Sequence, residues 1–209
     1  MNILKHIQFL VFVLFPACLM GMEQGSWIEQ DKLGKDVVIE WRKITDYQKL
    51  LESEKALIPV MAEAFAYQVE ETDKFEEQVA LVTEYIKKQN EAAMSKYLQR
   101  QKVKIFTSFV VTVKDAGTDK VLGFTMFHSK PKFQQGCVIL EPLAIIPTAQ
   151  GRGLSRFLVF SIFRLMPEAN QIDLFVRHES TKAQAIYNIL GFRVSEKKEH
   201  GMVLKYVKK

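Results

Sequence analysis

The feature that most constrains this chain is a pair of glycines between a strand-like run and a helix-like run. The run from Cys137 to Leu140 is apolar, and from Arg156 to Leu165 the apolar residues fall on one helical face. Gly151 and Gly153 stand between the two runs. Glycines one residue apart let the backbone turn several N–H groups to one side, and such groups at a helix start attract phosphate. The spacing predicts a strand–turn–helix unit, with a phosphate site or simple relief of backbone strain as alternative reasons for the glycines.

The residues around the glycines narrow this choice. Positions 143–155 read LAIIPTAQGRGLS. This segment resembles the acyl-CoA loop of the GNAT superfamily of N-acetyltransferases, which reads Arg/Gln-x-x-Gly-x-Gly/Ala after a strand reading Leu-Ala-Val-x-Pro. Gln150 fills the first place and Gly153 the fourth, while Ser155 stands where the family usually has Gly or Ala.

A second segment is similar to another signature of the same superfamily, Asn-x-x-Ala-x-x-x-Tyr-x-x-x-Gly-Phe. Four positions agree, and Ser180 replaces the usual Asn; the agreeing residues are Ala183, Tyr187, Gly191 and Phe192. The two signatures occur in the family's order. The resemblance extends over residues 37–207, although only 121–192 carries recognisable motifs.

The resemblance implies a site for acetyl-CoA. The pyrophosphate would lie on backbone N–H groups of the glycine loop, and the pantetheine arm would add to the open edge of the preceding strand through Leu143 and Ile145. A backbone N–H near Ile145 would stabilise the oxyanion while an amine attacks the thioester directly. The expected cofactor-binding residues are Leu143, Ile145, Gln150, Gly151, Arg152, Gly153, Leu154, Ser155 and Ser180.

Two side chains are candidates for moving protons. Tyr187 holds the position of the family's general acid, and a phenol is suited to protonate a departing thiolate; a ring packed on the buried face of a helix is the alternative. Glu141 is the candidate base for the acceptor ammonium, with a solvent-facing carboxylate as the alternative. His128 and His178 are further candidates for the base. No set of His, Cys and carboxylates has metal-ligand spacing, so we expect no metal.

The expected fold class is α/β (α+β). The resemblance implies a GNAT-like mixed, mostly antiparallel sheet with helices on both faces and a V-shaped splay between the fourth and fifth strands. A helical pattern begins near Tyr47, with Pro59 as a break or kink. Thr181 and Gln184 read as a capping box, and Gly191 as a left-handed cap. Strands are expected at residues 37–42, 104–114, 121–128, 137–140, 172–176, 192–194 and 202–207.

The amino terminus differs in kind from the rest of the chain. A positive start at Lys5 precedes an apolar run over residues 7–15, which is short of the roughly 20 residues of a spanning helix. Residues 1–21 therefore read as a secretory signal peptide cleaved after Gly21, or as a short membrane anchor, followed by a linker (22–35) and an acyltransferase domain (36–209). The expected location is secreted or extracytoplasmic, with membrane-tethered or cytoplasmic as alternatives.

Composition bounds the partners. A net charge of +5, without a basic stripe interleaved with aromatics, argues against nucleic-acid binding. Membrane contact is expected only through an uncleaved leader. The predicted function is transfer of an acetyl group to a primary amine on a small molecule or peptide; the alternative is an acyl-CoA-binding or regulatory module without turnover. The sequence leaves the acceptor and the oligomeric state open.

Overall fold

The computed structural model describes residues 23–45, 47–66, 107–129 and 136–208. The predicted leader and most of the segment between the first and second predicted strands lie outside these residues. No helix within the described ranges is long and apolar enough to cross a membrane.

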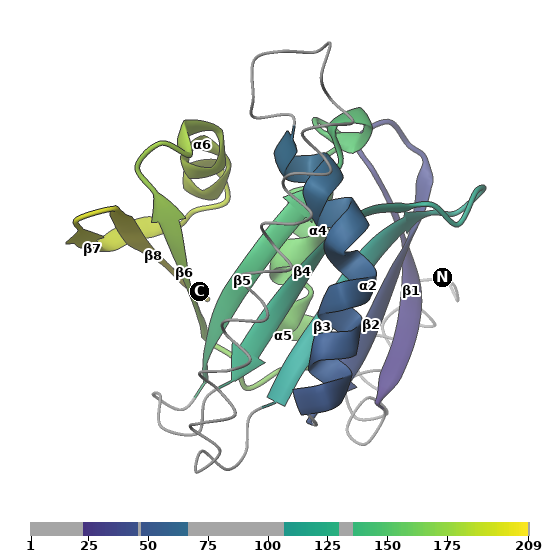
Figure 1. The fold of residues 1–209 in the computed structure, drawn as a ribbon, viewed down its shortest axis with the longest axis horizontal. Helices are drawn as coiled ribbons and strands as arrows, with labels where there is room; N and C mark the ends of the chain where they lie inside the picture. The colour runs from purple at the N-terminus through teal and green to yellow at the C-terminus, as the bar shows by residue number, and fades with distance from the viewer. Residues whose placement is uncertain (1–22, 46, 67–106, 130–135, 209) are drawn as a thin grey trace, which may run out of the picture.

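One twisted sheet organises the described part of the chain (Figure 1). Its strand order is β1-β2-β3-β4-β5-β6-β8-β7. Every neighbouring pair in this order is antiparallel except β5 and β6, which are parallel. The strands are β1 (Gln24–Gln30), β2 (Asp36–Ile44), β3 (Thr107–Asp115), β4 (Val121–Ser129), β5 (Cys137–Ile145), β6 (Gln171–Arg177), β7 (Arg193–Lys198) and β8 (Gly201–Val207).

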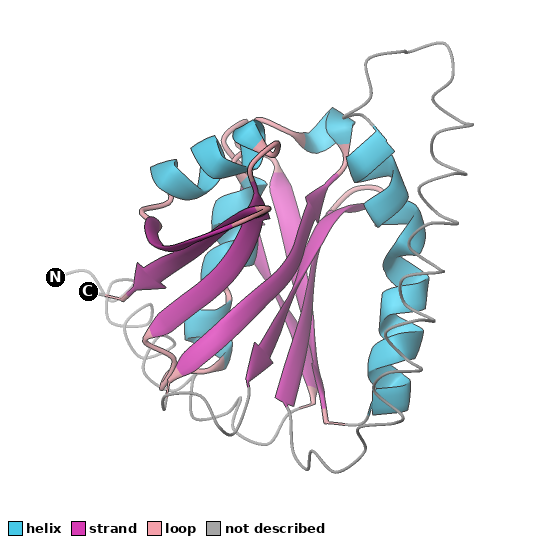
Figure 2. Cartoon of the chain, turned by 60° about the vertical axis from the view of Figure 1, so that its left-hand side comes forward, coloured by secondary structure: helices cyan, strands magenta, loops and turns pink. Residues whose placement is uncertain are grey.

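Helices cover both faces of this sheet (Figure 2). The long helix α2 (Tyr47–Ala66) lies on one face, and α4 (Leu154–Phe160) and α5 (Ile162–Leu165) lie on the other. A single turn of 3-10 helix, η2 (Pro147–Ala149), leads from β5 towards α4, and α6 (Thr181–Ile189) follows β6. The predicted mixed α/β fold is therefore confirmed.

The sheet divides the core into two layers because successive side chains of a strand point to opposite faces. Val111 of β3 packs in the same cluster as Leu158 of α4. Its neighbour Val110 packs in the cluster on the other face, with Leu57 of α2 and Phe124 of β4. The central strands are buried on both sides, which fixes their register and positions the end of β5.

The predicted splay lies between β5 and β6. Their parallel register runs only from Cys137 opposite Gln171 to Ile139 opposite Asp173. Beyond that point the two strands separate, as Figure 1 shows. The second half of β5 therefore has a backbone edge that β6 does not pair with.

The stretch expected to be a linker, residues 22–35, instead contributes a strand. β1 pairs with β2 from Gln24 opposite Arg42 to Gln30 opposite Asp36. Its side chains alternate between exposed and half-buried positions, and Trp27 packs against the core. Gly34, with a φ of +73°, allows the tight return to β2. Because the segment is mostly polar, the alternation of half-buried and exposed side chains was not recognised in the sequence.

A break or a kink was expected at Pro59, and the break is wrong because α2 runs through this residue. A proline inside a helix removes one backbone hydrogen bond and costs about 3 kcal/mol. Leu57, Ile58 and Ala62 on either side of it are buried. Tertiary packing of this face is what holds such a helix together despite the local penalty.

The start of α6 differs from the predicted capping box, whereas its end agrees. Ser180, not Thr181, is the N-cap, and no side chain makes a capping hydrogen bond. Gln184 Nε2 instead donates to the carbonyls of Arg177 (2.8 Å) and His178 (2.9 Å). Gly191 has a φ of +95°, so the predicted left-handed cap is confirmed.

Candidate functional site

The glycine loop joins the open end of β5 to α4. Gly151 and Gly153 both have a φ of +80°, a conformation that side chains rarely adopt. Gly153 is the N-cap of α4. A Cβ placed on Gly151 would meet no atom within 4 Å, so the loop is open at this residue.

The backbone N–H groups of this loop are free of internal partners. From Gly151 to Ser155, none donates to a backbone acceptor among the residues that the structure describes. The next N–H, that of Arg156, bonds to the Gly153 carbonyl at 3.2 Å. A run of unpaired N–H groups on a turned loop is a binding surface for an anion such as phosphate. Binding of the cofactor pyrophosphate by these groups stays a prediction.

The Gln150 side chain ties the loop to the strand before it. Its Nε2 donates to the Ile145 carbonyl at 3.2 Å. Gln150 was expected to bind cofactor, and here its amide instead fixes the position of the last residue of β5. This contact brings the loop and the strand end together as one unit.

The edge of β5 beside the splay is open where Leu143 and Ile145 lie. Ile146 N–H donates to the Leu122 carbonyl of the β4 side at 3.0 Å. Because alternate residues of an antiparallel strand direct their backbone groups to opposite sides, those of Ile145 and Leu143 face away from β4. That side is where β6 has diverged, so β6 does not pair with the Ile145 N–H.

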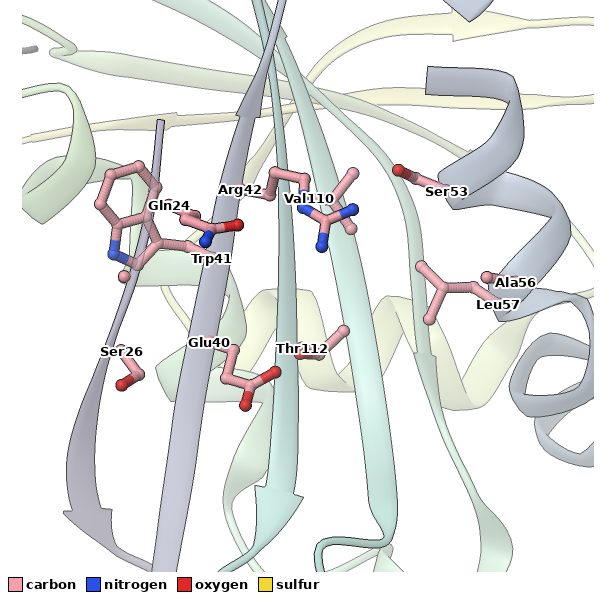
Figure 3. A pocket seen from close by; sticks show the side chains of 11 residues that line it. Gln24, Ser26, Glu40, Trp41, Arg42, Ser53, Ala56, Leu57, Val110 and Thr112 are labelled. Atoms are coloured by element: carbon pink, nitrogen blue, oxygen red, sulfur yellow. The ribbon is translucent and has the colours of Figure 1, made fainter. Parts of the chain in front are cut away.

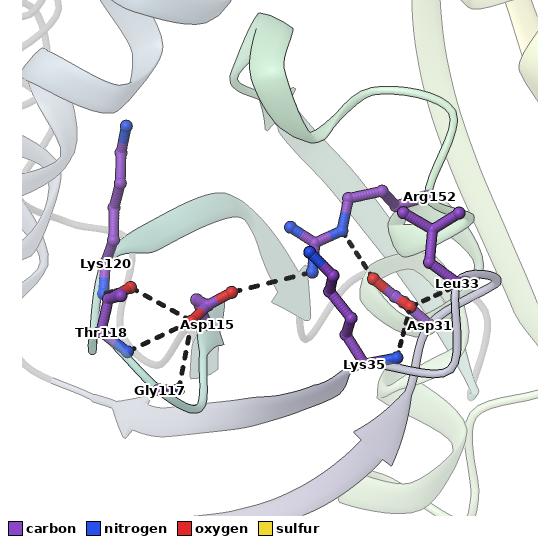
Figure 4. A network of polar contacts seen from close by, with 8 residues as sticks. All are labelled: Asp31, Leu33, Lys35, Asp115, Gly117, Thr118, Lys120 and Arg152. Carbon is purple, nitrogen blue, oxygen red and sulfur yellow. Dashed lines mark hydrogen bonds and ion pairs between the residues drawn. The ribbon is translucent and has the colours of Figure 1, made fainter.

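Arg152 does not offer its charge to the loop, contrary to the expectation that it helps bind the cofactor. Its Nε donates to Asp31 Oδ2 at 2.6 Å, and its Nη2 lies 3.9 Å from Asp115 Oδ2 (Figure 4). The Arg152 side chain is 12% exposed and that of Asp31 is 0% exposed. A buried carboxylate this close neutralises the guanidinium. The side chain therefore holds the loop in place against the turn that carries Asp31.

Asp31, which the sequence reading missed, is fixed by its own turn as well. Its Oδ1 accepts the N–H groups of Leu33 (2.8 Å) and Lys35 (2.9 Å). Burial acts to raise the pKa of Asp31, but the hydrogen bonds from Lys35, Arg152 and Leu33 outweigh it and lower the pKa below the ordinary 3.8. The signal was present in the sequence as Asp-x-x-Gly between two alternating runs, a pattern typical of a hairpin turn.

Replacing Asp31 with asparagine is expected to lower the thermal midpoint at pH 7, because Arg152 then keeps a buried charge without its partner. Folding lowers the Asp31 pKa, so its stabilising contribution is complete above the unfolded pKa of about 3.9 and disappears as the pH falls through the folded value. The difference from wild type should therefore shrink below about pH 4. Thermal unfolding of both proteins at pH 7 and pH 3 measures this difference in midpoint. Asp36→Asn, an exposed aspartate of the same hairpin, is the control; equal midpoints for the two variants at pH 7 would contradict the assignment.

Lys32, the neighbour of Asp31, also contacts the glycine loop. Its N–H donates to the Arg152 carbonyl at 3.0 Å. Its methylene chain runs so close to Gly153 that an added Cβ there would lie 2.9 to 3.2 Å from Cγ, Cδ and Cε of Lys32. The turn between β1 and β2 therefore packs directly on the loop.

Tyr187 lies on α6 with its side chain in the core. It is 7% exposed, and its ring meets that of Phe192 edge to face at 5.4 Å. Burial raises the pKa of the Tyr187 phenol above its usual 10, so the hydroxyl stays protonated. A protonated phenol is the form that a general acid needs, while the ring contact shows that the residue also packs.

The candidate bases fall into two groups. Glu141 is exposed, at a bulge where two residues of β5 lie opposite one of β4. His128 lies beside it: Nε2 is 3.3 Å from the Glu141 carbonyl and Nδ1 is 2.8 Å from Ser108 Oγ. His178 instead bonds through Nε2 to the Lys198 carbonyl at 3.0 Å, so it is directed to the β7–β8 hairpin.

A cavity of about 430 Å³ lies elsewhere, between α2 and the first three strands (Figure 3). Its lining includes Glu40, Arg42 and Thr112. Glu40 is already paired with Lys114 at 3.0 Å. None of the predicted site residues lines this cavity. In the described ranges, no group of three or more His, Cys, Asp or Glu residues is placed to hold a metal ion.

Comparison with known proteins defines the class to which this fold and loop belong. The model of the acetyltransferase (GNAT) family matches residues 68–192. The chain therefore belongs to the GNAT family of acetyltransferases. A search of curated proteins finds no match.

Solved structures resemble this chain at low sequence identity. The PaiA N-acetyltransferase of Thermoplasma acidophilum, in complex with coenzyme A, is 16% identical with a TM-score of 0.50, covering 81% of this chain and 98% of its own. The spermidine N-acetyltransferase of Vibrio cholerae, in complex with CoA and spermine, is 15% identical with a TM-score of 0.43, covering 80% and 95%. The first of these supports the fold assignment.

Proposed function

We propose that this protein is an N-acetyltransferase that transfers the acetyl group of acetyl-CoA to a primary amine. The observation that carries the proposal is the run of free N–H groups from Gly151 to Ser155 beside the unpaired edge of β5. In a chain of the GNAT family, this pair of features supports a site for the pyrophosphate and pantetheine of an acyl-CoA. The remaining proposed contact is Ser180, at the start of α6.

The proposed reaction is direct attack in a ternary complex. The neutral amine attacks the thioester carbonyl carbon, so that a C–N bond forms and the C–S bond breaks. Ile145 N–H donates to the carbonyl oxygen as negative charge develops there. Glu141 takes the proton of the acceptor ammonium before the attack, directly or through water, and Tyr187 protonates the leaving thiolate. The attacking nitrogen loses a second proton as the amide forms, and this proton replaces the one that Tyr187 gave up. The products are an amide and free CoA.

Two measurements on the full chain test this proposal. Calorimetry with acetyl-CoA measures binding, and thiol release with a panel of small-molecule and peptide amines measures turnover. We expect saturable binding and thiol release that depends on an amine. Binding without turnover across the panel would support the alternative, a module that binds acyl-CoA without catalysis, and absence of binding would refute both.

We also propose that residues 1–21 are a signal peptide and that the mature protein is extracytoplasmic. The proposed cleavage after Gly21 lies before β1, which begins at Gln24, so removal of the leader would leave the described sheet intact. Mass spectrometry of the native protein should find a chain beginning near Met22. A native chain that begins at Met1 would refute cleavage and favour a tethered or cytoplasmic protein.

A further inference from the structure

We infer that the turn between β1 and β2 forms part of the cofactor site, with Lys32 as a binding residue for the pyrophosphate. This inference rests on the proposed function. The turn lies outside the segment matched by the family model, residues 68–192. It adds a second cation beside the loop, whose own Arg152 is paired with Asp31.

The first argument is the position of the turn on the loop. The Lys32 N–H and the Asp31 carboxylate both bond to Arg152, to its carbonyl at 3.0 Å and its Nε at 2.6 Å. These two contacts join residues about 120 apart in sequence and hold the backbone of the turn against the loop. The Lys32 chain therefore starts from a fixed point beside the free N–H groups.

The second argument is the path of the Lys32 side chain. Its three outer methylenes lie against Gly153, close enough that a Cβ at this position would displace them. Glycine at position 153 therefore has two functions. It adopts the positive φ of the turn, and its lack of a Cβ leaves space for the Lys32 side chain. The contact places the outer methylenes of Lys32 beside the loop at Gly153, the N-cap of α4.

The third argument is charge. The Arg152 side chain is 12% exposed and its Nε is paired with Asp31, so this arginine is directed to the hairpin turn rather than to solvent. Lys32 is exposed, and none of the ion pairs within the described residues involves it. A lysine ammonium on a flexible stem binds phosphate as a point charge. In this inference the Asp31 carboxylate positions the loop, and the Lys32 ammonium binds the pyrophosphate.

The test compares Lys32→Ala with a matched control, Lys120→Ala, in calorimetry with CoA on the full chain. Lys120 is an exposed lysine of the β3–β4 turn, and its removal changes the net charge equally. We expect Lys32→Ala to weaken CoA binding about tenfold and to reduce its salt dependence, since hydrogen bonds to charged groups are lost. Lys32→Arg should stay within about threefold of wild type because it keeps the charge. Unchanged thermal midpoints will show that the variants are folded.

Dephospho-CoA, which keeps the pyrophosphate and lacks the 3′-phosphate, identifies the group that Lys32 meets. We expect the same loss of affinity with this ligand. A loss with CoA alone would overturn the pyrophosphate assignment. Equal affinities for Lys32→Ala and Lys120→Ala would overturn the inference while leaving the proposed function intact; failure of the wild-type chain to bind CoA would overturn the proposed function and the inference with it.

Discussion

Replacing Gly153 with aspartate is expected to weaken acetyl-CoA binding at least about 100-fold, because three effects act together. The φ of +80° is unfavourable for a residue with a Cβ. That Cβ would lie 2.9 Å from Cγ of Lys32 and displace its chain. The new carboxylate would repel a diphosphate and would also pair with the Lys32 ammonium.

Isothermal calorimetry with acetyl-CoA measures this loss, and Gly117→Asp is the matched control. Gly117 lies in the β3–β4 turn, and a Cβ there would meet only Asp115 Oδ1 at an ordinary 3.5 Å. The control adds the same charge without touching the glycine loop, so its affinity should stay close to that of wild type. An affinity of Gly153→Asp equal to that of the control would refute the loop assignment.

Tyr187→Phe is expected to lower kcat about 100-fold while the KM for acetyl-CoA changes little, since general acid catalysis contributes effects of this size. The substitution removes the hydroxyl and keeps the ring that packs against Phe192. Burial raises the pKa of the phenol above 10, so the wild-type acid stays protonated as the pH rises towards that value. We therefore expect no loss of activity from titration of Tyr187 below about pH 10.

Steady-state kinetics with thiol detection checks this prediction, with Tyr206→Phe as the control. Tyr206 is a half-buried tyrosine whose ring also meets Phe192, at 5.5 Å. Its loss of a hydroxyl should change neither kcat nor KM by more than about twofold. If Tyr187→Phe behaves like Tyr206→Phe, or if it lowers kcat and cofactor affinity equally, Tyr187 is a packing residue and the acid lies elsewhere.

The local sequence pattern was sufficient to predict the strand, the glycine turn and the helix that form the candidate site. The apolar run before the glycines, the glycines and the apolar helical face after them all lie within about 30 residues, and each follows from backbone preference and periodicity. Gly191 as a helix cap follows from the same local rules. The family resemblance likewise implied the splay that the structure shows between β5 and β6.

What the sequence by itself determined was therefore the strand–turn–helix unit, the class of fold and the open N–H groups from Gly151 to Ser155. Only the tertiary structure decided which charges reach that loop. The sequence predicts Arg152 as a phosphate ligand, whereas the fold pairs its side chain with Asp31, 121 positions away. Conversely, the sequence places Lys32 in a predicted linker, whereas the pairing of β1 with β2 places it in a hairpin turn. The physical reason is that backbone conformation is set largely by neighbouring residues, whereas burial and charge pairing depend on which distant segments the packed sheet brings together.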